Sequence, residues 1–487
     1  MLNRILLILS GLGLFITINA CSKPDLDTHK KPIQLFSKVS HPDKLNFPQL
    51  EVKIPKPERI VLGNGLIVYL LEDNELPLMN IKVLIRSGSI YDEDNKSGTA
   101  NLVAQLLRTG GTTKYPSEIL DEKLEYLAAE LGTSADYETM QISSSFLSRD
   151  FNTCMDILKD ILFAPLFPAD KLEIEKLQIL EAIRRENDRA ESIAGREFKR
   201  LIYPTHPYGN QIYGNAKSVP LITVSDVKRF YQNYFVPSNM IIGIAGNFKK
   251  DNIIPFIKES FGNESTQTTE AKIISPLERK YNKSINLITK DVNQLVIEFG
   301  HLGIKRLNPD FFSVILMNAI LGGESFVSRL HNEIREQRGL AYGVFSYFTM
   351  PKDIGMFIVG TSTKNESVHQ VVSLIIQEIK KMQENLVEEA ELKNTKEGIL
   401  NGFVFRFDDS SRVVEQYMFR EHFGLPPDYL ETYRDNIMKV SREDIRRAAQ
   451  EYLNPENYIL LVVGNSEKFD KPLSEFGQVN EIKLESR

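Results

Sequence analysis

Hydrophobic and polar residues follow two different periods along this chain. Apolar residues recur with the period of an amphipathic helix in four segments: 155–162, 172–188, 311–321 and 368–384. Apolar and β-branched runs predict strands over 82–87, 140–147, 286–300 and 356–361. Because helices and strands alternate, the sequence predicts an α+β fold whose sheets are covered on one face by helices.

One part of the pattern occurs twice. Residues 226–247 align without a gap on residues 444–465, and nine positions are identical. Both copies predict an amphipathic helix, a break at proline and asparagine, and a strand that ends at Gly-Asn. The repeat therefore predicts two homologous domains in tandem.

Turn and linker residues suggest the domain limits. Gly63-Asn64-Gly65 separates two strand-like runs, as in a β-hairpin. Residues 263–283 are polar and poor in large apolar side chains, which is typical of a linker. We expect an N-terminal domain over 56–262, a linker over 263–283, a C-terminal domain over 284–470 and a tail over 471–487.

The first residues have the pattern of an export signal. A basic start at Arg4 precedes the apolar stretch 5–20, which is shorter than the roughly 20 residues that span a bilayer. The end of this stretch, Ile18-Asn-Ala-Cys21, resembles the lipobox of bacterial lipoproteins. We expect a signal peptide over 1–20, lipidation at Cys21, a tether over 21–55 and a membrane lipoprotein that faces the periplasm or the cell surface. The alternative is a plain signal peptide with a chance cysteine.

Composition narrows the class of protein. The 487 residues carry a formal charge of −6, and no concentrated basic run occurs, which argues against a nucleic-acid partner. Two cysteines cannot form a disulfide framework, and seven scattered histidines leave little material for a histidine-rich metal site.

Six landmarks, in order, carry a family resemblance. They lie at 62–68, 87–93, 97–107, 206–214, 321–330 and 335–342. Together they resemble the insulinase/pitrilysin family of inverted zinc metallopeptidases, in particular its short, processing-peptidase-like members. The resemblance implies two tandem homologous α/β-roll domains that form half of a clam-shell around a peptide.

The resemblance also locates the family's zinc motif, whose metal-binding and base residues are replaced in this chain. In the family, a helix carries the motif His-x-x-Glu-His. Its two histidines and a distant glutamate bind the zinc, and the glutamate within the motif is the general base. The corresponding positions here are Asn101, Ala104, Gln105 and Ala182. Amides are poor zinc ligands beside imidazole, and alanine neither binds metal nor accepts a proton. We expect this chain to bind no cofactor and to be inactive alone as a metallopeptidase, with zinc in a partner subunit.

An Arg/Tyr pair of the family is retained in the second domain. In active members these two residues reach toward the scissile bond, and here they are Arg335 and Tyr342. A tyrosine hydroxyl can donate to an oxyanion, and a guanidinium can hold peptide carbonyls or a carboxylate. Alternatively, Arg335 complements a helix C-terminus before Gly339, and Tyr342 starts a buried strand.

Three other residues have structural interpretations. Glu175 matches an acidic residue that the family often keeps near the metal, but we expect a solvated or salt-bridged side chain here. His206 is expected to be a packing histidine, and Cys154 a small buried residue rather than a nucleophile.

Three functions remain open. The preferred hypothesis is a zinc-free subunit that pairs with a zinc-bearing homologue as a heterodimer and supplies Arg335 and Tyr342 in trans for the hydrolysis of a peptide substrate. The first alternative is a structural or peptide-binding lipoprotein of the same fold. The second is an independent hydrolase with a different site.

Overall fold

The described part of the chain forms two six-stranded mixed sheets. The computed structural model describes residues 53–264, 269, 272–324 and 326–484, so the predicted signal peptide, Cys21 and most of the tether lie outside the described residues. Within the described residues, no helix is both long and apolar enough to cross a membrane.

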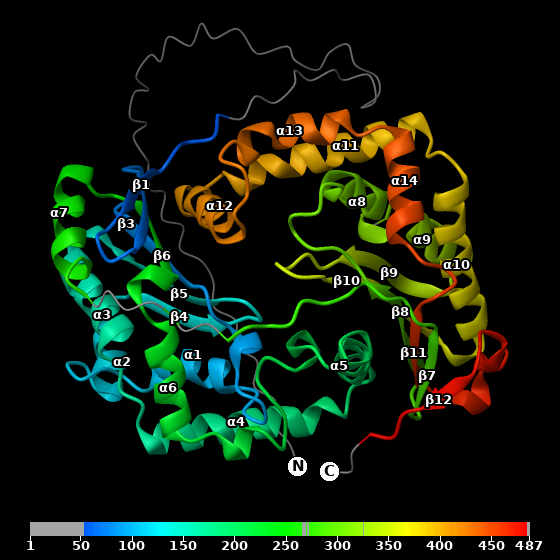
Figure 1. The fold of residues 1–487 in the computed structure, drawn as a ribbon, viewed down its shortest axis with the longest axis horizontal. Helices are drawn as coiled ribbons and strands as arrows, with labels where there is room; N and C mark the ends of the chain where they lie inside the picture. Colours follow the sequence, from blue (N-terminus) through cyan, green and yellow to red (C-terminus); the bar gives the residue numbers. More distant parts are fainter. Residues whose placement is uncertain (1–52, 265–268, 270–271, 325, 485–487) are drawn as a thin grey trace, which may run out of the picture. The chain divides into compact units, whose positions relative to one another are not determined.

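The two sheets are seen in Figure 1, and five of the six strands follow the same order in both. The first sheet runs β1-β2-β6-β3-β5-β4, formed by β1 (Glu58–Val61), β2 (Ile67–Glu72), β3 (Leu78–Ile85), β4 (Glu130–Ala135), β5 (Met140–Leu147) and β6 (Met240–Gly246). The second runs β12-β7-β11-β8-β10-β9, formed by β7 (Ser284–Thr289), β8 (Gln294–Leu302), β9 (Ala341–Phe348), β10 (Met356–Lys364), β11 (Ile459–Gly464) and β12 (Val479–Glu481). The α+β class and its two homologous domains are therefore confirmed.

The sequence repeat corresponds to one helix and one strand in each domain. Helix α6 (Val224–Tyr234) precedes β6, and α14 (Arg442–Tyr452) precedes β11. Each helix begins with a reciprocal capping box, Thr223 with Asp226 and Ser441 with Asp444. Strand β6 lies parallel to β2 and antiparallel to β3, and β11 lies in the same way between β7 and β8.

Helices of its own domain cover one face of each sheet. The first core includes α1 (Thr99–Thr109), α3 (Phe151–Phe163), α4 (Ala169–Glu186), α6 and α7 (Lys250–Phe261). The second core includes α8 (Phe311–Asn318), α10 (Val368–Glu384), α11 (Glu389–Phe403), α13 (Tyr429–Lys439) and α14. Residues of β6 from Met240 to Gly246 are all buried, which suits a central strand covered on both faces.

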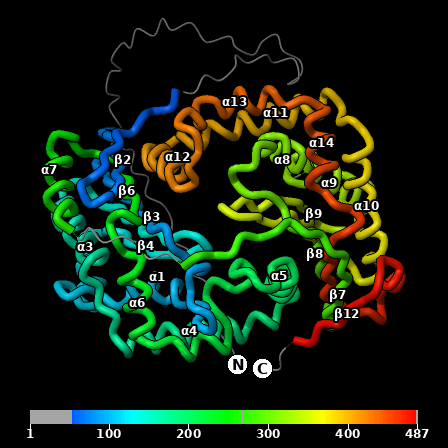
Figure 2. The backbone as a smooth tube through the Cα atoms, viewed as in Figure 1, coloured from blue at the N-terminus to red at the C-terminus, as the bar shows by residue number. Residues whose placement is uncertain are grey.

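The opposite face of each sheet is covered by a helix from the other domain, and we call these two the exchanged helices. Helix α5 (Ala190–Ile202) follows α4 in sequence but packs on β8 and β11 of the second sheet, whereas α12 (Ser410–Phe423) packs on β2 and β6 of the first (Figure 2). Gly243 permits the close approach of α12, because a Cβ there would overlap Val414 and Met418. Helices therefore cover both faces of each sheet, whereas the sequence predicted cover on one face.

The observed elements differ from the predicted ones in two places. The run 286–300 forms two strands, β7 and β8, because the polar residues Lys290, Asp291 and Asn293 interrupt it. The expected tail contributes β12, which pairs in parallel with β7, and Leu473 is buried. The folded C-terminal part therefore extends at least to residue 481.

Candidate functional site

Helix α1 carries the first three positions of the degenerate motif. Its start is fixed by Asp92, whose carboxylate accepts the backbone N–H groups of Gly98 at 2.7 Å and Ala100 at 2.8 Å. Gly98 has a φ of 105°, and a Cβ there would meet the carbonyl of Tyr213. Helix α1, which carries the first three positions of the motif, is therefore formed and capped at its N-terminus.

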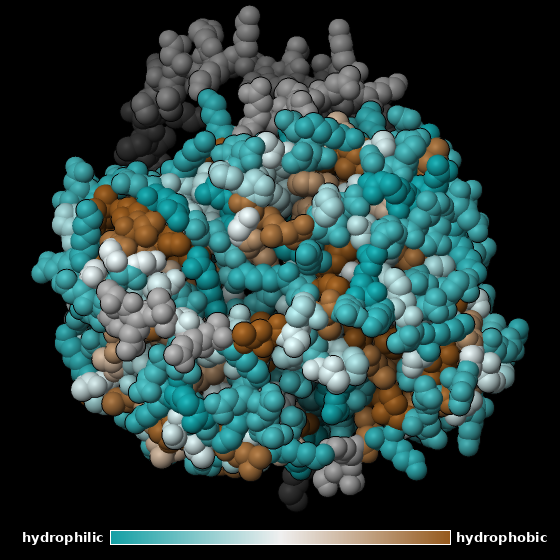
Figure 3. Space-filling view, viewed as in Figure 1, coloured by the Kyte–Doolittle hydropathy of each residue, from teal (hydrophilic) through white to brown (hydrophobic). Residues whose placement is uncertain are grey.

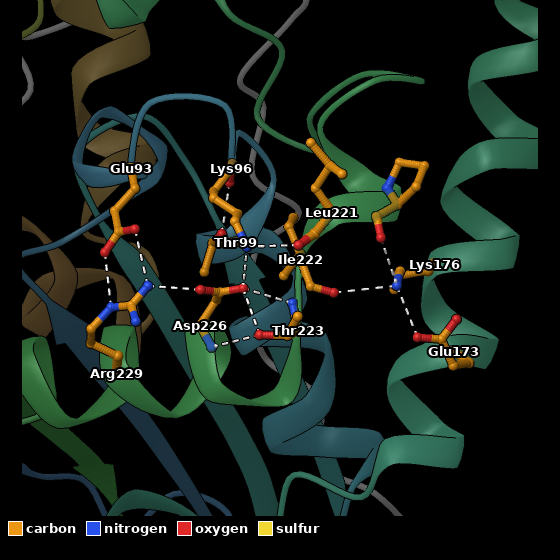
Figure 4. Close-up of polar contacts among 11 residues, drawn as sticks. Glu93, Lys96, Thr99, Glu173, Lys176, Leu221, Ile222, Thr223, Asp226 and Arg229 are labelled. Atoms are coloured by element: carbon orange, nitrogen blue, oxygen red, sulfur yellow. Dashed lines mark hydrogen bonds and ion pairs between the residues drawn. The ribbon is translucent and has the colours of Figure 1, made fainter.

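A charged network holds the segment before α1 against α6 (Figure 4). Lys96 donates to the Asp226 carboxylate and to the Leu221 carbonyl, the latter at 2.6 Å. Arg229 joins the Asp226 carboxylate to that of Glu93 through a bidentate pair. Hydrogen bonds from these cations and from Thr223 hold the pKa of Asp226 below its usual range, although burial alone would raise it.

The degenerate positions lie on two helices that pack together. Asn101 and Gln105 are half-buried one turn apart on α1, and Ala104 is fully buried between them. Ala182 is exposed on α4, which contacts α1. Among the described residues, no three His, Cys, Asp or Glu side chains come together as a metal-binding group. The two helices are present, but the three ligand positions hold two amides and one methyl group, and the base position holds a second methyl group.

The other residues considered in the first domain are buried. Glu175 on α4 is 7% exposed and forms no ion pair with a described residue, so the expected salt bridge is not seen and little of this side chain reaches solvent. His206 packs against Tyr203 and Tyr208, and its Nδ1 accepts the Tyr208 N–H. Burial raises the pKa of the Cys154 thiol to about 11, which disfavours the reactive thiolate.

Arg335 and Tyr342 meet at the open edge of the second sheet. Arg335 lies on a π-helical turn at Asn332–Glu336, and Tyr342 lies on the edge strand β9. The guanidinium carbon lies 5.1 Å from the centroid of the Tyr342 ring, within cation–π distance. Tyr342 is 86% exposed, so it does not start a buried strand, and its hydroxyl is available to a ligand.

Two further residues shape this site. The Arg335 guanidinium also lies 5.0 Å from the ring centroid of Phe326, which is 66% exposed and adopts a φ of 69°. Arg335 Nη1 donates to His331 Nε2 at 3.0 Å, and because arginine only donates, the proton of this neutral imidazole is on Nδ1. Arg335 is thus held between two aromatic rings and oriented by a buried histidine.

Of His331 and Phe326, only His331 could have been found from the sequence. His331 precedes Arg335 by one helical turn, a spacing at which side chains meet. Nothing in the sequence around Phe326 indicates a left-handed backbone, because that conformation is unusual for a phenylalanine.

Known proteins share both halves of the chain. A profile described as "Insulinase (Peptidase family M16)" matches residues 68–216, and one described as "Peptidase M16 inactive domain" matches 221–399. The "Non-peptidase homolog YmxG" of Helicobacter pylori is 27% identical over 402 residues, which cover 82% of this chain and 91% of that protein. The "Uncharacterized zinc protease YmxG" of Bacillus subtilis is 22% identical, with 84% and 98% covered.

Solved structures share the fold. The peptidase M16 inactive domain from Pseudomonas fluorescens superimposes with a TM-score of 0.80 at 26% identity, covering 86% of this chain and all of that one. The periplasmic protease PqqL from Escherichia coli gives a TM-score of 0.71 at 15% identity, and the match covers 91% of this chain but only 52% of that chain. The present chain therefore corresponds in fold to about half of the longer protein.

Proposed function

This chain belongs to the insulinase (M16) peptidase family, and from that premise we propose that it is the zinc-free subunit of a heteromeric peptidase. It is an inactive-type homologue, because Asn101, Gln105 and Ala182 occupy the ligand positions of the family motif and Ala104 occupies the base position. In the proposed complex, a homologous partner supplies the zinc and the general base, and this chain supplies contacts to the peptide.

The observation that carries the proposal is the geometry of Arg335 and Tyr342. Both side chains are held at an open sheet edge, although the zinc positions of the same chain have lost their chemistry. His331 occupies Nη1 of Arg335, and Glu336 lies 3.5 Å from Nε, so Nη2 is left to bind a peptide carbonyl or carboxylate. The exposed Tyr342 hydroxyl can donate to an oxyanion that forms in the partner's site.

The need for a partner follows from the same reasoning. A guanidinium and a phenol stabilise charge but supply neither a nucleophile nor a metal-activated water. The fold of this chain matches 52% of the periplasmic protease PqqL, which is consistent with a second unit of similar size completing a peptidase. We propose a zinc-bearing homologue as that second unit.

We further propose that the protein is exported and anchored in a bacterial membrane through Cys21, facing the periplasm or the cell surface. The lipobox-like sequence before Cys21 supports this assignment. Several acyl chains, at about 0.8 kcal/mol for each buried methylene, would hold the chain firmly at the membrane.

The catalytic role is tested by reconstitution with the zinc-bearing homologue that co-purifies with the chain. Arg335→Ala and Tyr342→Phe are each expected to lower kcat by about 100-fold, the effect of removing one oxyanion donor, without weakening the complex. Arg338→Ala and Tyr126→Phe are matched controls, because Arg338 pairs with Glu333 and Tyr126 is exposed in the first domain. Full activity in both test variants would exclude the proposed role and leave a structural or peptide-binding subunit.

A further inference from the structure

A cavity lies between the two sheets. It has a volume of about 580 Å³ and is bounded by the first sheet, α12, α5 and the end of β9. The surface seen in Figure 3 is mostly hydrophilic with separate apolar patches, whereas this cavity has six aromatic rings in its wall: Tyr137, Tyr203, Tyr208, Tyr347, Phe419 and Phe423. It is large enough for two or three peptide residues.

The carboxylates of the cavity wall already have partners. Glu415 forms an ion pair of 2.9 Å with Lys82. Glu138 accepts the Tyr208 hydroxyl and the backbone N–H of Lys352. Asp136 lies on the exposed rim and accepts the backbone N–H of Tyr137 at 2.7 Å. The Glu415 carboxylate is therefore paired with a cation, whereas the Glu138 and Asp136 carboxylates are engaged by hydrogen bonds.

The Lys199 ammonium lacks such a partner. It projects from α5, lies 3.3 Å from the Tyr137 hydroxyl and 5.4 Å from the centroid of that ring, and forms no ion pair with a described residue. Burial lowers its pKa, although the charge of Asp136 opposes the shift. An ammonium has three donors, so Lys199 can still bind an anion.

His422 adds an unpartnered polar group on the facing helix α12. It is 6% exposed, lines the cavity, and its Nδ1 has no hydrogen-bond partner. Burial, together with the charges of Lys352 and Arg86, lowers its pKa to about 3, so the ring is neutral. Lys352 and Arg86 form no ion pair with a described residue, although the charge of Glu138 acts on Lys352 and that of Glu421 on Arg86.

We propose that this cavity binds the free C-terminal carboxylate of a peptide together with its last, aromatic side chain. Lys199 pairs with the carboxylate, the surrounding aromatic rings contact the side chain, and His422 hydrogen-bonds to a peptide amide. Charge and aromatic surface select this ligand over an amidated or a basic peptide end. The site lies within one chain, so it is independent of the proposed partner subunit.

The absence of tryptophan from the sequence provides a direct test. The purified full chain is titrated with acetyl-Ala-Ala-Trp as the free acid and as the C-terminal amide, and the peptide's tryptophan emission is followed. We expect saturable binding of the acid with a blue shift, and binding of the amide at least tenfold weaker. Equal binding of the two peptides, or binding of neither, would overturn the proposal.

Variants at Lys199 test whether this residue causes the preference for the free acid over the amide. Lys199→Met should abolish the difference between acid and amide, and Lys199→Arg, which keeps the charge, should retain most of it. Lys393→Met is the matched control, because Lys393 is exposed on α11. Discrimination that survives in Lys199→Met contradicts the assignment, and because no partner is present, this result is distinct from a failure of the proposed peptidase role.

Discussion

Arg335 illustrates how one side chain depends on its neighbours for a defined position. A free arginine has many rotamers, and ordering it costs conformational entropy. Here the rings of Phe326 and Tyr342 restrict the guanidinium, and His331 fixes the direction of Nη1. The histidine is buried, so its hydrogen bond is protected from competition with water. His331 is a positioning residue in this arrangement.

A prediction at this scale concerns the thiols. Cys154 is buried and its thiol pKa is raised to about 11, so it should not react with a thiol reagent in the native protein and should react once in denaturant. The proposed acylation of Cys21 leaves no other thiol in the chain. Thiol titration of protein from native membranes measures this count. A thiol that reacts without denaturant would indicate an unmodified Cys21.

At the scale of elements, the two capping boxes offer an internal comparison. Asp226 and Asp444 occupy the same position in the two repeats, and both cap the start of a helix. Asp226 is buried and also binds Lys96 and Arg229, whereas Asp444 binds only Arg447 among the described cations, at 3.5 Å. The first helix should therefore depend more strongly on its cap.

We predict that Asp226→Asn lowers the free energy of unfolding by about 2 kcal/mol, the cost of losing charge-assisted hydrogen bonds. Because the folded-state pKa lies below that of the unfolded chain, ionised Asp226 stabilises the protein above the unfolded-state pKa. This contribution is lost as the pH falls toward the folded-state value. The variant should accordingly lose less stability than the wild type on acidification.

Urea denaturation at neutral and acidic pH measures both effects, with Asp444→Asn as the control. We expect the control to lose about 1 kcal/mol, as for an ordinary helix cap. Equal losses in the two variants would show that Lys96 and Arg229 contribute nothing beyond the capping box.

The local elements were largely predictable from the sequence. The helix over 368–384 and the strand over 140–147 have the predicted bounds. Apolar residues repeat at the helical period along the helix, and buried positions alternate along the strand. The break between β7 and β8 was missed because the residues on both sides are strand formers. The contacts of α5 and α12 with the opposite domains were not predictable, because they join segments far apart in the sequence. The site around Arg335 was predicted only in its Arg/Tyr pair, since the backbone that exposes Phe326 depends on tertiary structure.

At the scale of the whole molecule, the exchanged helices link the two sheets. The Tyr69 hydroxyl donates to Glu421 of α12 at 2.6 Å, and Arg59 forms a bidentate pair with the same carboxylate. From the other side, the Tyr203 hydroxyl donates to the Ile354 carbonyl at 3.2 Å. The two domains therefore fix the walls of the cavity together, as a pre-organised binding unit requires.

The central claim is that this chain works without its own zinc beside a subunit that carries one. The most direct test is capture of the chain from its native membrane in mild detergent, with zinc determined in the captured complex and in the isolated chain. We predict stoichiometric zinc in the complex and none in the chain alone. Stoichiometric zinc in the isolated chain, or a complex without zinc, would contradict this account.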